Sequence, residues 1–151
     1  MARRNPSNEP FQLPPVTPGE WKGEIVGRGS ANIGQVVQHE PSRRSVEFSY
    51  IILPALLDMP SPKVRWPCTV IMAPTPMKAV YEDAGSLIKA GDKPLLTLAL
   101  DVTREQFSDI LRLHEARRLQ AFHFTVEAQR GDDPHSWPIH GWGMSVSMEA
   151  R

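Results

Sequence analysis

Hydrophobic and polar residues alternate in several short runs along the chain, and each such run predicts a β-strand. The runs are 21–28, 45–53, 64–72, 94–102, 121–127 and 141–150. A period of two places every second side chain on the same face of a strand, as in an antiparallel sheet with one buried face. In the run 45–53, the residues that share a face are Val46, Phe48, Tyr50 and Ile52.

The two final runs have well-defined faces and a short connection, so they predict a hairpin. In the first of them, Phe122, Phe124 and Val126 lie on one side. In the second, the residues expected to point inward are Trp142, Met144, Val146 and Met148.

The spacing of apolar residues changes at 103–118, where it predicts an amphipathic helix. The residues of its apolar stripe are Phe107, Ile110, Leu111 and His114. Thr103 and Gln106 stand at capping-box spacing, so each side chain can bond the other residue's free backbone N–H. This helix is the best-specified element of the sequence.

A second helix is predicted at 76–90, from helical spacing between Met77 and Ile88. Thr75 would be its N-cap and Gly91 its C-terminal stop. Gly85 weakens the middle of this segment, so a strand with a loop is the alternative.

These elements predict an α+β fold, with a mainly antiparallel sheet of about five to seven strands packed by one or two helices. The sheet could be curved or sandwich-like. Prolines 6, 10, 14, 15 and 18 predict an extended proline-rich arm at 1–19, which leaves residues 20–151 as a single domain.

Glycines punctuate the segment 29–34, which predicts a flexible loop. Its two end glycines have the spacing of a phosphate-binding loop. That loop needs a Lys and a Ser or Thr next, whereas Gln35 and Val36 follow here. Ordinary turn chemistry is therefore the expectation.

Composition removes several classes of function. The chain has 151 residues and a formal net charge of zero, so no overall field attracts a polyanion or an anionic membrane. A single cysteine, Cys68, excludes an internal disulfide and is expected to be a buried small hydrophobe. The basic N-terminus lacks a following apolar segment, so we expect a cytoplasmic protein without a secretory signal.

The densest group of potential metal ligands lies in the segment 130–140. Its members are Asp132, Asp133, His135 and His140. Carboxylates and imidazoles together can hold a divalent cation that activates water. Their spacing matches none of the metalloprotease, deaminase or EF-hand signatures, and the same residue types serve hairpin loops, so no metal or other cofactor is expected.

His114 is the one titratable residue within the apolar stripe of the predicted helix. It could act as a general base facing a cleft, with Glu127 or Asp101 nearby. The favoured interpretation is a hydrogen-bonded histidine at the rim of the core.

Arginine pairs and tryptophans raise the possibility of a nucleic-acid surface. The candidates are the arginine pairs at 3–4, 43–44 and 117–118, together with Trp21, Trp66, Trp137 and Trp142. Among the tryptophans, Trp137 is expected to be exposed in a loop. The neutral net charge argues against this function.

The leading prediction is a non-enzymatic protein-interaction or self-assembly module. A protein partner or a second copy would bind through the N-terminal arm or a sheet edge, with Trp137, His140, His114, Arg117 and Arg118 as candidate binding residues. The alternatives are a nucleic-acid-associated protein and a small metal-dependent hydrolase that uses the 132–140 loop. No membrane partner is expected.

Overall fold

The structure is a computed structural model that describes residues 13–60, 63–74, 83–91, 93–131 and 133–148. Strands hold 58% of the described residues and the helix only 10%, so the described part of the protein is mainly β. The elements are β1 Gly19–Ile25, β2 Ser30–Gln38, β3 Arg44–Asp58, β4 Arg65–Pro74, β5 Gly85–Lys89, β6 Leu96–Val102, α1 Arg104–Glu115, β7 Leu119–Val126 and β8 Ser136–Val146.

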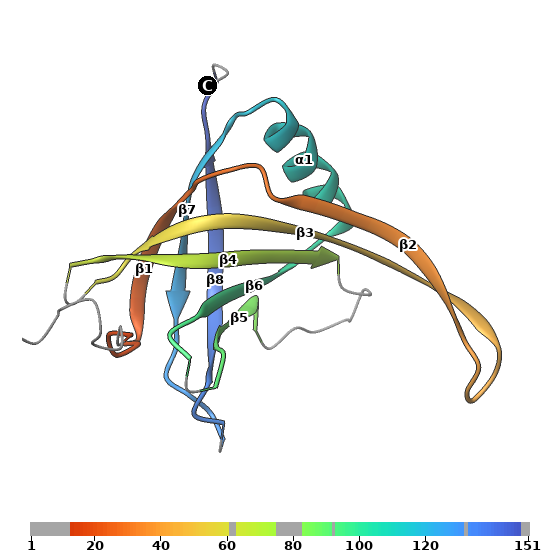
Figure 1. Cartoon of the computed structure of the whole chain (residues 1–151), viewed down its shortest axis with the longest axis horizontal. Coiled ribbons are helices and arrows are strands. Elements are labelled where there is room, and N and C mark those ends of the chain that lie inside the picture. The colour runs from red at the N-terminus through yellow and green to blue at the C-terminus, as the bar shows by residue number, and fades with distance from the viewer. Residues whose placement is uncertain (1–12, 61–62, 75–82, 92, 132, 149–151) are drawn as a thin grey trace, which may run out of the picture.

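Seven of the described strands close into a barrel (Figure 1). The sheet runs β1-β7-β8-β5-β6-β4-β3, and β1 then pairs with the end of β3 to complete the ring. The predicted α+β sheet packed by helices is therefore wrong. Alternation along a strand reports only that one face is buried, and it is the same in an open sheet and in a closed barrel.

The core fills the interior of this barrel. Leu53 and Leu57 of β3, Val70 of β4 and Leu98 of β6 are fully buried. Trp21 and Phe124 pack with ring centroids 5.9 Å apart, across the paired strands β1 and β7. Inward-facing side chains from successive strands thus meet inside the ring.

Strand β4 pairs with β6 in parallel, and every other described pairing is antiparallel. The parallel ladder begins at Cys68 opposite Leu96, one residue after Pro67. Proline has no N–H to donate, so it is tolerated where the strand has no partner on that side.

The predicted capping box is confirmed. The Gln106 backbone N–H donates to Thr103 Oγ1 at 3.0 Å, and the Thr103 N–H donates to Gln106 Oε1 at 2.9 Å. Phe107 and Ile110 are buried, and the helix packs against β4 and β7. It ends at Glu115 and not at residue 118, because Arg117 adopts a positive φ of 57°.

The predicted second helix is wrong where it can be observed, because residues 85–89 form β5 between β6 and β8. Gly85 has φ of 154°, and a Cβ there would lie 2.2 Å from the carbonyl oxygen of Ala99. The absence of a side chain at Gly85 thus allows β5 and β6 to approach each other closely. Residues 75–82 lie outside the described part of the chain.

The predicted glycine loop is also wrong, because residues 30–38 form β2. Gly34 sits opposite Phe48, and a Cβ there would lie 2.6 Å from the Phe48 ring. The glycine accommodates an aromatic ring from the neighbouring strand, which a loop assignment misses.

The hairpin of β7 and β8 is confirmed, and Phe122, Phe124 and Val126 face the core as predicted. Trp142 and Met144 are half-buried against the core. Val146 and Met148 are 40% and 83% exposed, contrary to the inward position predicted for them. The register between Leu119 and Ala121 shifts by one residue, and such a shift exchanges the two faces of a strand.

None of the helices in the described part is long and apolar enough to cross a membrane.

Candidate functional site

A two-stranded ribbon extends from the barrel (Figure 1). It consists of β2 and the first half of β3, which pair without interruption from Ser30 opposite Ile52 to Gln38 opposite Arg44. We call residues 30–52 the hairpin arm. Strand β4 joins β3 only from Ile51 onward, so the outer part of the arm has no third strand among the described residues.

The outer edge of β2 is therefore open along its length in the described structure. An open edge presents a row of unpaired backbone N–H and C=O groups, onto which another strand can add. β-Branched residues favour an extended conformation here, since Ile33, Val36 and Val37 all belong to β2.

One face of the arm continues the outside of the barrel. Ile51 and Leu53 point into the core, so the alternate residues of β3 point outward. The outward residues are Val46, Phe48, Tyr50 and Ile52, with Val36 joining them from β2 opposite Val46. We call these five residues the apolar face. Its four β3 residues were visible in the sequence as a stripe, and the structure places that stripe on the solvent side of β3.

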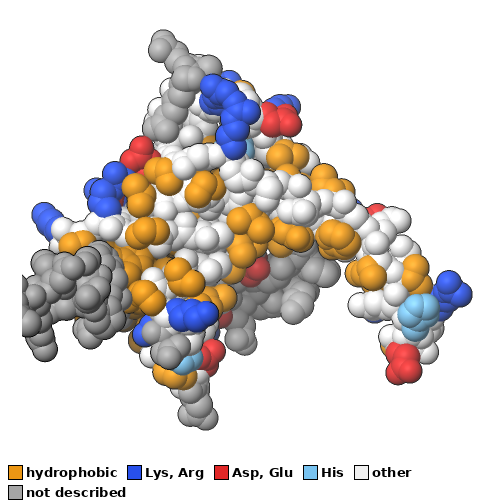
Figure 2. Space-filling view, viewed as in Figure 1, with side chains coloured by type: hydrophobic (Ala, Val, Ile, Leu, Met, Phe, Trp, Pro, Cys, Tyr) orange, Lys and Arg blue, Asp and Glu red, His pale blue; other side chains and the backbone are white. Residues whose placement is uncertain are grey.

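Large apolar side chains on the arm are exposed on both of its sides. Val36 and Phe48, on the apolar face, are 53% and 44% exposed. Ile33 and Val37, on the opposite side, are 72% and 42% exposed. Figure 2 shows hydrophobic side chains along the arm. Burying the exposed part of each one would contribute roughly 0.5–2 kcal/mol, so covering the arm would add a favourable term.

The base of the arm is held by specific contacts. Gly29 has φ of 65°, and its backbone lies so close to β3 that a Cβ would be 1.9 Å from the Ile52 carbonyl oxygen. His114 Nε2 donates a hydrogen bond to the carbonyl of Arg28. Further along the arm, Arg104 reaches Glu47 at 3.3 Å, but both side chains are mostly exposed, so this pair contributes little.

The contact of His114 places it at the edge of a cleft of about 430 Å³, between α1 and the start of the arm. Arg28, Glu115 and Arg117 also line this cleft. Glu127, one of its predicted partners, lies beyond the far end of β7 and bonds other groups. The structure therefore gives His114 a hydrogen bond to backbone, and no carboxylate among its described contacts.

The residues proposed for a nucleic-acid surface are not gathered into one. Arg118 Nε donates to the carbonyl of Ser147 at 2.9 Å, which attaches it to the chain after β8. Trp137 is a half-buried residue of β8 packed against the core, contrary to its predicted position in an exposed loop. The indole N–H groups of Trp21 and Trp66 donate to backbone carbonyls.

The residues proposed for a metal site are likewise separated by their own contacts. Asp133 Oδ1 accepts the backbone N–H of His135 at 2.9 Å, which is turn chemistry. His140 Nδ1 lies 2.9 Å from Glu127 Oε1. Asp132 is outside the described residues, and those described contain no group of three or more potential metal ligands.

Glu127 belongs to a polar cluster that the sequence did not predict. Arg130 pairs with Glu127, and Arg130 Nη2 also lies 3.0 Å from Asp83 Oδ1. The hydrogen bond from Arg130 lowers the pKa of Glu127 below its ordinary value. The cluster joins the segment before β5 to the connection after β7, which is a structural role.

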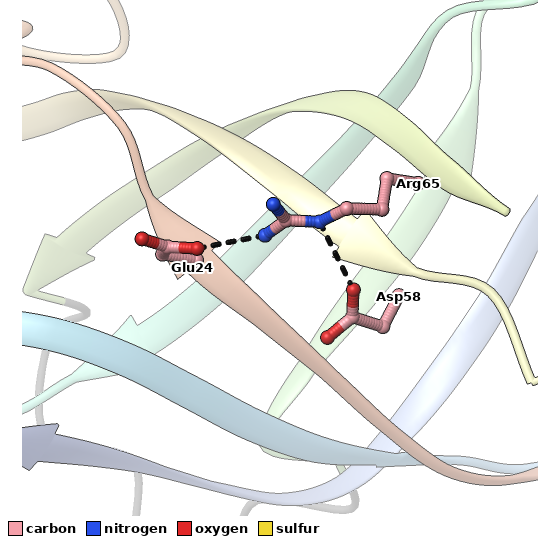
Figure 3. A network of polar contacts seen from close by, with 3 residues as sticks. All are labelled: Glu24, Asp58 and Arg65. Carbon is pink, nitrogen blue, oxygen red and sulfur yellow. Dashed lines mark hydrogen bonds and ion pairs between the residues drawn. The ribbon is translucent and has the colours of Figure 1, made fainter.

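A second polar network lies where the barrel closes (Figure 3). Arg65 donates to Glu24 at 2.7 Å and to Asp58 at 3.2 Å, so it joins β4 to both β1 and β3. Hydrogen bonding to Glu24 raises the pKa of Arg65. A cleft of about 580 Å³ beside it is lined by Lys63 and His123 among others.

Cys68 is buried in β4, as predicted. Burial raises the pKa of its thiol to about 12, so the reactive thiolate is scarce at neutral pH.

The described end of the predicted N-terminal arm packs on the barrel of its own chain. Leu13 and Val16 are half-buried against the core, and the Trp21 indole holds the carbonyl of Thr17 at 2.9 Å. Residues 1–12 lie outside the described part.

Comparison with known proteins gives no match, whether to a family model, to a curated protein or to a solved structure.

Three of the exposed apolar residues of the arm, Ile33, Val36 and Val37, were not predicted from the sequence. One signal could have found them. Residues 29–38 contain no charged residue and no proline, which is unusual for a polar surface loop and suits a strand that meets another strand.

Proposed function

We propose that this protein is a non-enzymatic interaction module that binds another polypeptide strand along the open edge of β2. The observation that carries the proposal is the combination of that edge with exposed apolar side chains on both sides of the arm. Strand addition satisfies the free backbone groups of the edge, while the side chains give the interaction its selectivity.

The composition of β2 supports this function. Proteins commonly protect an exposed edge strand with lysines, prolines or a bulge. Strand β2 has none of these, and its pairing with β3 is regular along its whole length. An unprotected edge is a hazard for a protein that stays alone, and it is useful to one that binds a strand.

The arm is also built to present this edge. Its backbone ladder with β3 fixes the position of β2, and Phe48 covers Gly34 and stacks on Tyr50 with ring centroids 6.4 Å apart. A preformed edge loses less conformational entropy on binding than a flexible loop would.

The two other functions expected from the sequence have less support. A nucleic-acid surface would need the arginines and Trp137 together, and the hydrolase would need its ligands together. The described contacts of these residues lead elsewhere.

Photo-crosslinking tests the proposal directly. A photoreactive amino acid replaces Val37 on the arm and, in a matched control, Leu95 just before β6, which is 56% exposed. We expect irradiation in cells to give a discrete, nuclease-resistant protein adduct at position 37 and none at position 95. Absence of the adduct at 37, equal adducts at both positions, or a nuclease-sensitive adduct would each contradict the proposal.

A further inference from the structure

We infer that the strand which adds to β2 is β2 of a second copy of this chain, paired antiparallel about a twofold axis that passes beside Gln35. This inference rests on the proposed function and names its partner. It follows from the charge, the symmetry and the side-chain order of β2.

The charge pattern permits self-pairing. Residues 29–38 carry no charge, and the flanking charged residues are Arg28 and Glu40, with His39 beside the latter. When a strand pairs with its own copy, any charge near the axis meets a like charge, which destabilises the pair. The edge of β2 avoids this penalty over its whole length.

Symmetry then limits the possible registers. A twofold axis that relates two antiparallel neighbours is perpendicular to the sheet, so one residue must lie opposite its own copy. All other pairs follow from the choice of that residue. The central residue should therefore be the one that places the exposed apolar side chains of the two strands opposite each other.

Gln35 is the centre that matches them. It places Ile33 opposite Val37 of the partner subunit, and the twofold axis repeats this apolar pair on the other side. Ile33 and Val37 lie on the same face of β2, separated by four residues, so both pairs form on one surface of the joined sheet. Cross-strand pairs of β-branched residues are among the stabilising contacts of antiparallel sheets.

The other face fits as well. With Gln35 at the centre, Val36 of the partner subunit lies opposite Gly34. Phe48 already covers Gly34 and is 44% exposed, so the incoming valine meets the ring where it is uncovered. The apolar faces of both arms then become continuous.

Neighbouring centres are poorer. A centre at Gly34 places Ile33 opposite the partner's Gln35, and a centre at Val36 places Ile33 opposite the partner's His39. Each loses both pairs between isoleucine and valine.

The shape of the molecule leaves room for this pairing. The arm extends away from the barrel in Figure 1, so two copies joined through their arms keep their barrels apart. Residues 32–38 of each copy would pair, over about 23 Å of strand. The product is a four-stranded ribbon that connects two barrels.

Engineered disulfides test the register in the purified protein. Opposed residues in an antiparallel pair have Cα atoms about 4.5–5.5 Å apart, which is within reach of a disulfide. We expect Gln35→Cys to form a covalent dimer on mild oxidation. Ile33→Cys and Val37→Cys should each fail alone, because self-pairs at these positions are about 13 Å apart along the strands. The double variant I33C/V37C should crosslink again.

The natural thiol does not interfere with this experiment, because Cys68 is buried inside the barrel. Equal crosslinking of the three single variants would show that the copies collide at random and do not pair in one fixed register. That result would overturn the inference.

Charge variants test the same contact without covalent bonds. In the inferred pair, I33K/V37K brings lysines together, whereas I33E/V37K places a glutamate opposite each lysine. We expect sedimentation analysis to find a dimer for the natural chain and for I33E/V37K. For I33K/V37K we expect the dissociation constant to rise at least about tenfold with an unchanged circular dichroism spectrum. A natural chain that is monomeric at all concentrations, or two variants that dimerise equally, would overturn the inference.

The outcomes separate the inference from the function on which it rests. A monomeric chain that still gives a protein adduct from position 37 would refute only the second copy as partner. A monomeric chain without that adduct would refute both.

Discussion

Adjacent leucines in β3 give a sharp test of the barrel, because only one of them faces its interior. Leu57 is fully buried, whereas Leu56 lies on the outer side and is only half-buried. We compare Leu57→Ala with Leu56→Ala, which remove the same atoms from neighbouring positions. The residues differ only in the side of the sheet on which their side chains lie.

The expected magnitudes follow from burial. Leu57→Ala removes buried apolar atoms from the core and leaves a cavity. It should therefore lower the free energy of unfolding by about 3 kcal/mol. Leu56→Ala should cost about 1 kcal/mol, because its side chain keeps contact with solvent. For a chain of this length, the larger loss corresponds to a fall in Tm of roughly 6–12 °C.

Urea unfolding followed by tryptophan fluorescence measures both values, since Trp21 and Trp66 are buried and change environment on unfolding. All variants are compared at one protein concentration, because self-association would make stability depend on concentration. Equal losses, or a larger loss at position 56, would refute the register of β3, since a slip of one residue exchanges its faces.

Three further predictions concern other parts of the molecule. Gly29→Ala should destabilise the protein by at least about 2 kcal/mol more than Gly91→Ala, measured by urea unfolding; both residues have positive φ, but only Gly29 meets a backbone oxygen, and equal effects would contradict that close approach. Glu127→Gln should remove stability at neutral pH. The pKa of Glu127 is lowered by folding, so its contribution is present above the unfolded value of 4.5 and is lost as pH falls through the folded value. The two proteins should therefore converge in acid, and a constant difference across pH would contradict the assignment. Cys68 should react with a thiol reagent only as fast as the protein unfolds, because its pKa is raised to about 12 by burial, and rapid labelling of the folded protein would count against this burial.

Local features of the fold were predictable where short-range chemistry decides them. The capping box of Thr103 and Gln106 needs only residues three apart, and it appears as predicted. The inward face of β7 was predictable because Phe122 and Phe124 alternate with more polar neighbours, without a break over that stretch.

Features that depend on distant partners were not predictable in this way. The pairing of β1 with both β3 and β7 turns a sheet into a barrel. The sequence of β1 does not indicate that it pairs with two strands. The outward stripe of β3 was visible, but alternation gives two faces without saying which one is buried when both are apolar. Ile51 and Leu53 proved to be the buried set.

Glycines caused the largest errors, for a physical reason. The sequence around Gly34 predicts a loop and that around Gly85 a helix with a weak middle, but both glycines lie in strands. In each case the missing side chain makes space for a neighbouring strand or ring. A sequence shows the missing side chain but not the group that fills its place.

The candidate site was predictable only in kind. A sheet edge was expected as the place of interaction, and the arm provides one. Of the residues named for it, Trp137 is half-buried and Arg118 is bonded to the chain after β8, whereas His114 contacts the chain just before the arm.

The double pairing of β1 also has a consequence for the order in which the chain can fold. Its neighbours are residues 55–58 on one side and residues 121–126 on the other. During synthesis, β2, β3 and β4 can pair as they emerge, because they are consecutive antiparallel neighbours. The ring itself must wait for β7. For several seconds on the ribosome, a nascent chain would therefore expose the inner side of β3 and β4. Completing a ring through such distant contacts is intrinsically slow, so folding speed and protection of the unfinished chain will govern its yield as much as its final stability does.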